Sequence, residues 1–243
     1  MTGSAGPAAS GLRRFARPAT TPAPDPAAPP SAPEGSAARE RCELCATDIP
    51  AEHGHIADID AASLLCACRA CYLLFTQGSR TAKYVAVPDR YLADPARPMP
   101  PAILDELEIP VGLAFFLRTA RSGGELTGFY PSPAGVTECQ LDLRVWERLE
   151  ADFPLLREPA GDVEAVLISR VGDRGFRGGA DGAASGVEYF LVPVDACYEL
   201  AGRMRMDWRG FDGGSEARQN IATFLATVRE RARPFAATGE QRG

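Results

Sequence analysis

The feature that most constrains this chain is a cluster of metal-ligating side chains between Cys42 and Cys71. This segment holds five of the seven cysteines and both histidines of the 243-residue sequence. A module of about 35 residues is too small to bury an adequate hydrophobic core, and normally needs a metal ion or disulfides in order to fold. The clustering and the size of the segment therefore both predict a metal-binding module.

Two Cys-x-x-Cys pairs lie at the ends of this segment: Cys42 with Cys45, and Cys68 with Cys71. Such a turn lets two thiolates reach one ion, and the separation of the pairs is in the range of zinc ribbons and treble clefs. Zinc accepts four thiolates in a tetrahedron because its filled d-shell imposes no other geometry. We therefore predict these four cysteines as zinc ligands.

Three further side chains leave the ligand set open. His53, His55 or Cys66 could replace one of the four cysteines. Alternatively, the two histidines lie on the hairpin between the pairs, one in solvent and the other hydrogen-bonded to a carboxylate such as Asp58. Cys66 would then be a small buried side chain.

Other chemistries fit the segment less well. A rubredoxin-like iron site uses the same four sulfurs, but Ala46 and Tyr72 follow the second cysteine of each pair, where glycine is usual. A thioredoxin-like motif needs a strand-to-helix junction of a βαβ unit, which neither pair indicates. An HNH nuclease would match His55 but needs an asparagine, and the module has none. Zinc is favoured, with iron as the alternative.

Composition divides the chain into four parts. Ala, Pro, Gly, Ser and Thr fill 30 of the first 40 positions, so we expect residues 1–40 to be a disordered tail. The metal-binding module is predicted at residues 41–80. A mixed antiparallel α+β domain is predicted at 81–233, followed by a flexible end at 234–243.

Hydrophobic patterning predicts the elements of this α+β domain. We expect a short strand at 84–87 and two strand pairs, 111–118 with 125–130 and 163–171 with 187–194. The Gly-rich loop 172–186 has no GK[ST] ending, which argues against a phosphate-binding loop. Helices are expected at 142–152 and 196–206, and from Ser215 as N-cap to about residue 233.

The α+β domain offers no catalytic constellation. It contains no histidine, which excludes a Ser-His-Asp or Cys-His site built within it, so we predict a protein that is not an enzyme. Trp208 and Phe211 lie in a Gly-rich stretch before the last helix, where they either bind a partner or anchor the loop in the core. Cys139 and Cys197 are isolated and are expected to be structural.

Charge and hydropathy bear on partners and location. The formal net charge of −6 disfavours nucleic acid, so a zinc-ribbon regulator is only a further alternative. No apolar run approaches the roughly 20 residues of a membrane span, so we expect no membrane insertion. Arg13 and Arg14 lack the apolar stretch of a twin-arginine export signal. We expect a cytoplasmic protein, in which thiols stay reduced.

Seven segments together carry a resemblance to a known family: CELC, HGHI, LLCACRACYLLF, VPDRY, FYPSPAG, VPVDACYEL and WRGFDGG. They resemble an uncharacterised actinobacterial family whose members are typically encoded beside high-affinity nickel-iron hydrogenase genes. The resemblance covers about residues 41–233, and Ala46 departs from it where glycine is expected. The family has no established activity, so the resemblance implies a setting and carries no residue role.

These observations favour a zinc-binding accessory protein that acts by protein–protein interaction. By the resemblance, its partner would be a hydrogenase subunit or a maturation factor. The alternative is a rubredoxin-like iron protein for electron transfer or oxygen protection.

Overall fold

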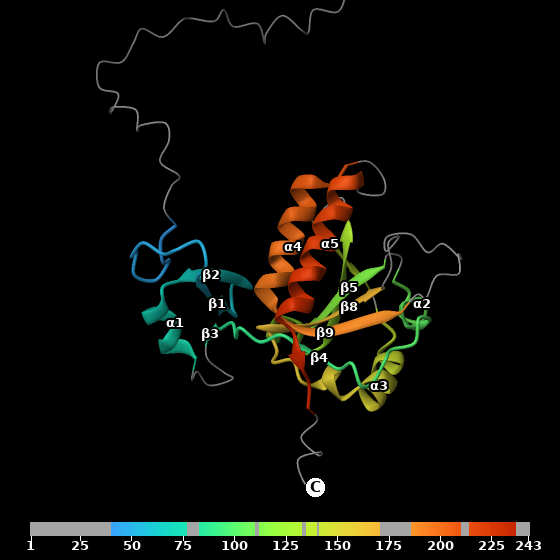
Figure 1. Ribbon diagram of the computed structural model, residues 1–243. Helices are drawn as coiled ribbons and strands as arrows, with labels where there is room; N and C mark the ends of the chain where they lie inside the picture. Colours follow the sequence, from blue (N-terminus) through green and yellow to red (C-terminus); the bar gives the residue numbers. More distant parts are fainter. Residues whose placement is uncertain are drawn as a thin grey trace, which may run out of the picture. The chain divides into compact units, whose positions relative to one another are not determined.

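Two β-sheets organise the chain in a computed structural model (Figure 1). The structure describes residues 40–76, 83–109, 112–132, 135–139, 141–170, 186–209 and 214–236, which all belong to one unit that spans Arg39–Gly243. The predictions for the tail, for most of the Gly-rich loop 172–186 and for Phe211 lie outside these ranges.

The smaller sheet has the strand order β2-β1-β3 and belongs to the cysteine-rich segment. It consists of β1 (Gly54–Asp58), β2 (Ser63–Ala67) and β3 (Tyr84–Ala86), and both strand pairs are antiparallel. The helix α1 (Arg69–Phe75) follows β2 directly. Strand β3 was expected in the α+β domain, but its backbone pairs with β1 because the chain crosses back to this hairpin.

The larger sheet has seven strands in the order β10-β4-β9-β8-β5-β6-β7. Neighbouring strands are antiparallel, apart from the parallel pair of β10 with β4. The strands are β4 (Leu92–Ala93), β5 (Leu113–Arg118), β6 (Leu126–Ser132), β7 (Gly135–Cys139), β8 (Glu164–Arg170), β9 (Val187–Pro193) and β10 (Arg233–Pro234).

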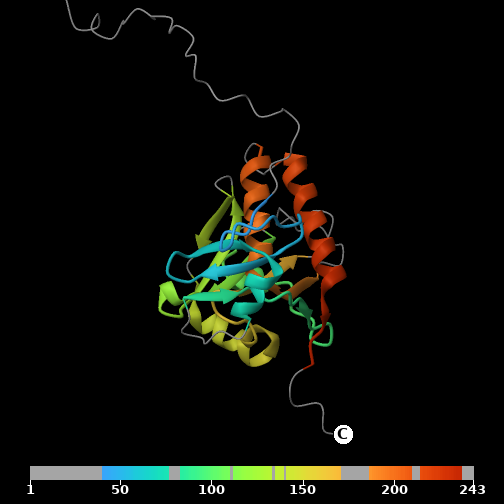
Figure 2. The ribbon, with the colours of Figure 1, turned by 90° about the vertical axis from the view of Figure 1, so that its left-hand side faces the viewer.

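Helices cover both faces of this sheet. The long helices α4 (Val194–Asp207) and α5 (Gly214–Arg231) pack on one face, and they run side by side in Figure 2. The short helix α2 (Ile103–Glu106), α3 (Leu143–Asp152) and the 3-10 turn Pro154–Arg157 pack on the other face. A further 3-10 turn, Ala120–Ser122, lies between β5 and β6.

Strand β8 illustrates why the sheet is buried on both sides. Ala165 and Leu167 point into the core under α4 and α5, whereas Val166 and Ile168 point into the core on the α3 side. Successive side chains of a strand point to opposite faces, so a strand covered on both faces reads as a continuous apolar run. The predicted run at 163–171 has this origin.

Helix α3 begins where its sequence predicts. The Asp142 carboxylate accepts a hydrogen bond from the backbone N–H of Arg144 at 2.9 Å and so caps the first turn. Leu149 is buried, but the most buried residue of the helix is Trp146, whose ring centroid lies 4.8 Å from that of Phe116 in β5.

The prediction of a cysteine-rich module with a mixed antiparallel α+β domain is confirmed. Strand β7 was not predicted, and α5 begins at Gly214, so Ser215 lies inside the helix rather than at its N-cap. At the end expected to be flexible, Pro234 belongs to β10 and Phe235 packs against the core cluster that includes Tyr189. None of the described helices is long and apolar enough to cross a bilayer.

Candidate metal centre

The first Cys-x-x-Cys pair lies in a tight backbone turn. The N–H of Cys42 donates to the carbonyl of Thr47 at 2.8 Å, and the N–H of Ala46 donates to the carbonyl of Cys42 at 2.7 Å. Ala46 closes the turn with φ of 59°, in the left-handed region that favours glycine. The sequence expectation of glycine at this position thus has a backbone cause, and alanine tolerates the same turn at some cost.

The second pair opens a helix. Cys68 is the N-cap of α1, and its sulfur accepts the backbone N–H of Cys71 at 3.5 Å. Cys71 therefore lies in the first helical turn, with its side chain near that of Cys68. The first cysteine turn, the β1–β2 hairpin and the helix that carries the second pair follow one another along the chain, an order that fits the predicted zinc-ribbon- or treble-clef-like module.

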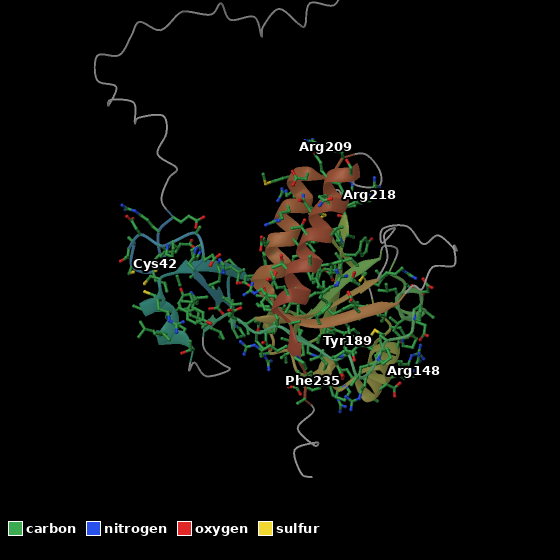
Figure 3. The ribbon with its side chains drawn as sticks, viewed as in Figure 1. Cys42, Arg148, Tyr189, Arg209, Arg218 and Phe235 are labelled. Atoms are coloured by element: carbon green, nitrogen blue, oxygen red, sulfur yellow. The ribbon has the colours of Figure 1, made fainter. Side chains whose placement is uncertain are left out.

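The structure brings the four predicted cysteines together. One ligand atom from each of Cys42, Cys45, Cys68 and Cys71 lies within 4.8 Å of the others. The sulfurs of Cys45 and Cys68, which come from different pairs, are 3.7 Å apart. In Figure 3, Cys42 marks this group beside the hairpin. Four sulfur ligands at this separation are close enough to bind one metal ion, and thiolates suit zinc or iron.

The protonation of these thiols depends on their neighbours. The backbone N–H of Cys68 lowers the pKa of the Cys42 thiol to about 6, and contact with Thr47 lowers the pKa of Cys45. Sharing a proton with Cys68 raises the pKa of Cys71 to about 12. Adjacent thiolates repel one another, so near neutral pH a bound cation favours the loss of all the protons of the group.

Packing against α1 fixes the hairpin beneath the cysteines. A Cβ atom at Gly54 would lie 2.5 Å from the ring of Tyr72, so only glycine fits at this position of β1. The Tyr72 hydroxyl donates to the carbonyl of Val87 at 2.8 Å and ties the helix to the chain beyond β3. The buried residues Ala57, Val87, Val163 and Val194 then join this module to the larger sheet.

Both histidines lie at the hairpin, with partners other than the expected ones. His53 Nδ1 is 2.9 Å from the carbonyl oxygen of Pro50, and His55 Nδ1 is 2.8 Å from Oδ2 of Asp195 in α4. The expected contact of one histidine with a carboxylate is confirmed for His55, although the carboxylate is Asp195 rather than Asp58. The expectation that the other histidine lies in solvent is wrong, because the His53 side chain is 7 % exposed. Asp58 instead accepts the backbone N–H of Ala61 at 3.0 Å.

Cys66 lies with these histidines, in a group separate from the four cysteines. Ligand atoms of His53, His55 and Cys66 are within 4.8 Å of one another. Cys66 was expected to be buried, but it is partly exposed. Its partial burial still raises the pKa of its thiol. The three residues weighed as substitutes in the first group thus form a second group.

The remaining candidate residues lie away from both groups. Trp208 is partly buried against the core beneath α4 and α5, which fits the core-anchoring interpretation; Phe211 lies outside the described residues. Cys139 and Cys197 are free thiols in β7 and α4. Burial raises the pKa of Cys197.

Sequence reasoning missed Asp195 and Glu43. Asp195 is 140 positions from the histidine that it contacts, so no spacing rule connects them. It does lie in VPVDACYEL, one of the segments that carry the resemblance. Glu43 accepts the backbone N–H of Cys66 at 2.6 Å and links the first cysteine turn to β2.

Comparison with known proteins places these features in a family. The model of DUF5947, a family of unknown function, matches residues 41–232. Neither the curated proteins nor the solved structures include a significant match. The match covers the cysteine-rich module and every strand of the larger sheet except β10, so the chain belongs to the DUF5947 family of unknown function.

Proposed function

We propose that this protein is a zinc-binding accessory protein that acts by protein–protein interaction and has no catalytic activity of its own. The observation that carries the proposal is the cluster of four cysteine ligand atoms within 4.8 Å, built from a turn and a helix start. In this proposal zinc is structural: it links the first cysteine turn to α1 and holds the intervening hairpin.

The zinc site supports a recognition role because of what surrounds it. Leu44 lies in the first cysteine turn, and Leu73 and Leu74 lie on α1, with 50 % and 75 % of their surface exposed. These are three of the six large hydrophobic side chains exposed in the described part of the chain. Exposed apolar side chains gathered beside one site are typical of partner-binding surfaces.

The charge of the module indicates the kind of partner. Residues 40–76 contain six acidic side chains against two arginines, and zinc with four thiolates would add two negative charges. Nucleic acid is therefore disfavoured. A protein that offers an apolar patch edged with basic side chains fits this surface.

The resemblance described above suggests where to look for this partner. Members of the family that it names are typically encoded beside nickel-iron hydrogenase genes, so we propose a hydrogenase subunit or a maturation factor. A cytoplasmic location is part of the proposal, because reduced thiols are needed as ligands.

Affinity purification from a hydrogen-oxidising host tests the proposal. The full chain should recover a hydrogenase component, and the double variant Leu73→Glu/Leu74→Glu should lose it. Leu143→Glu changes a similarly exposed leucine on α3 and should retain the partner. Recovery of no hydrogenase component by the full chain, or equal recovery by all three proteins, would contradict the proposal.

A further inference from the structure

The geometry of the β1–β2 hairpin places three metal-ligating side chains on one face. His53 and His55 are two residues apart in extended chain, so their side chains point the same way, whereas Gly54 between them faces Tyr72. Cys66 is the direct cross-strand partner of His55 in the antiparallel register. Alternation along one strand and register across the pair therefore bring the two imidazoles and the thiol together.

One atom of this group lacks a partner that it needs. The side chain of His53 is only 7 % exposed, and its Nε2 is buried with no hydrogen-bond partner among the described residues. A buried polar atom without a partner costs free energy, and such atoms are rare in folded proteins. A metal ion within reach of this nitrogen would supply the missing interaction.

The other nitrogen of each ring is already held by an acceptor. Nδ1 of His53 is bonded to the Pro50 carbonyl, and Nδ1 of His55 to the Asp195 carboxylate. A Nδ1–H that donates to an acceptor leaves Nε2 with a free lone pair, which is the form that binds a metal. Metal-ligating histidines usually have such a carbonyl or carboxylate behind them.

We propose that His53, His55 and Cys66 form a second metal site, distinct from the site of the four cysteines. Two imidazoles and one thiolate suit a borderline first-row divalent cation, of which zinc is the commonest. The three side chains leave the fourth tetrahedral position to water or to a donor from another molecule. In contrast to the first site, this site would hold an exchangeable ligand.

Charges near the group favour a cation. Glu40 Oε2 is 3.5 Å from His53 Nδ1, and Glu43 is bonded to the backbone of Cys66. The Asp195 carboxylate lies behind His55. Zinc bound to four thiolates next to this group would add further negative charge, so filling the first site should not prevent filling of the second.

A nucleophilic relay of Cys66, His55 and Asp195 is the other arrangement that these residues suggest. It would use the same bond between His55 and Asp195, but it would leave His53 with no role and its buried nitrogen unexplained. The metal site accounts for all three side chains and for both acceptors behind the imidazoles.

Cobalt(II) titration of the reduced, metal-free full chain tests the second site, because cobalt reports its ligands by colour. We expect two equivalents to bind. One should give the absorption of a tetrathiolate site, and the other should add a weaker thiolate charge-transfer band and d–d bands at shorter wavelength. Binding of a single equivalent by the full chain would overturn the proposal.

Variants assign each equivalent to its residues. His53→Ala and Cys66→Ser should each lose the second equivalent and keep the tetrathiolate spectrum, whereas Cys139→Ser, a thiol outside both groups, should bind two. Two equivalents with unchanged spectra in both His53→Ala and Cys66→Ser would also overturn the proposal. Should either variant not fold, zinc X-ray absorption of the unaltered chain decides: mixed nitrogen and sulfur ligation is expected, and sulfur alone contradicts the site. A failed search for a protein partner would leave these results unaffected.

Discussion

The Nδ1 atom of His55 in β1 lies 2.8 Å from Oδ2 of Asp195 in the first turn of α4. This bond joins the hairpin of the cysteine-rich module to α4, a helix that packs on one face of the larger sheet. Asp195 raises the pKa of His55, mainly through this hydrogen bond and against the opposing effect of partial burial. The relation predicts a pH-dependent stability.

In a zinc-loaded Cys66→Ser background, which keeps the four-cysteine site and leaves His55 free to titrate, Asp195→Asn should cost more stability at pH 6 than at pH 9. Because the folded-state pKa of His55 is raised above 6.5, the stabilisation by this pair is fully present below about pH 6.5. It is lost as the pH rises through the folded-state pKa. We expect a cost of about 1 kcal/mol at pH 6, measured by urea unfolding of the reduced, zinc-loaded proteins.

The proton NMR signal of the His55 ring supplies the control for this prediction. Proton NMR should give a lower His55 pKa in Asp195→Asn than in its parent protein. An equal loss of stability at both pH values would mean that Asp195 acts by packing alone.

Removal of metal should loosen the cysteine-rich module and leave the larger sheet intact. The module has few buried side chains of its own, whereas the seven-stranded sheet has a core on each face. Hydrogen exchange with a strong zinc chelator should therefore rise in residues 42–75 and stay unchanged in β8 and β9. The contrary result is equal exchange with and without chelator across the module.

Gly54→Ala should destabilise the module by about 1–3 kcal/mol, because the added methyl group would meet the ring of Tyr72 at 2.5 Å. Gly202→Ala in α4 is the matched control: a Cβ there meets nothing within 4 Å, so a gain of about 0.5–1 kcal/mol is expected. Chemical unfolding measures both. The cost at Gly54 should shrink in a Tyr72→Ala background, and a cost that does not shrink would place the effect elsewhere.

Glu164→Ala should cost about 2–3 kcal/mol of unfolding free energy, the effect of removing a hydrogen-bonded buried charge. Glu164 is 1 % exposed. Its carboxylate oxygens accept hydrogen bonds from Nε and Nη2 of Arg90, at 2.7 and 2.6 Å, and from the backbone N–H of Ala160. Glu199→Ala breaks a surface pair with Arg203 and should cost less than about 1 kcal/mol. Similar costs for both variants would contradict the prediction that the buried pair contributes more to stability than the surface pair.

Local patterns predicted a good part of this structure. The apolar runs of β8 and β9 and the cap of α3 at Asp142 depend on neighbouring residues, so the sequence alone indicates them. The cysteine spacing indicated a group that the fold brings together. At Ala46, where the resemblance leads us to expect glycine, the structure shows a backbone in the left-handed region, which favours glycine.

Contacts between distant segments could not be predicted in this way. The pairing of β3 with β1 and the bond of His55 with Asp195 depend on how the chain returns to the hairpin. The separation of His53, His55 and Cys66 from the four cysteines depends on the strand register, which spacing does not give. From spacing alone, these three residues could therefore be predicted only as substitutes for one of the four cysteines.

Metal analysis with a visible spectrum, on the full chain purified without air or an affinity tag, tests the central claim most directly. We predict a colourless protein that contains zinc, and loss of the tetrathiolate-bound metal when Cys42 and Cys68 are both changed to serine. A visible charge-transfer band with bound iron would contradict the zinc assignment. A metal-free protein whose cysteine-rich module is nevertheless folded would contradict the metal site itself.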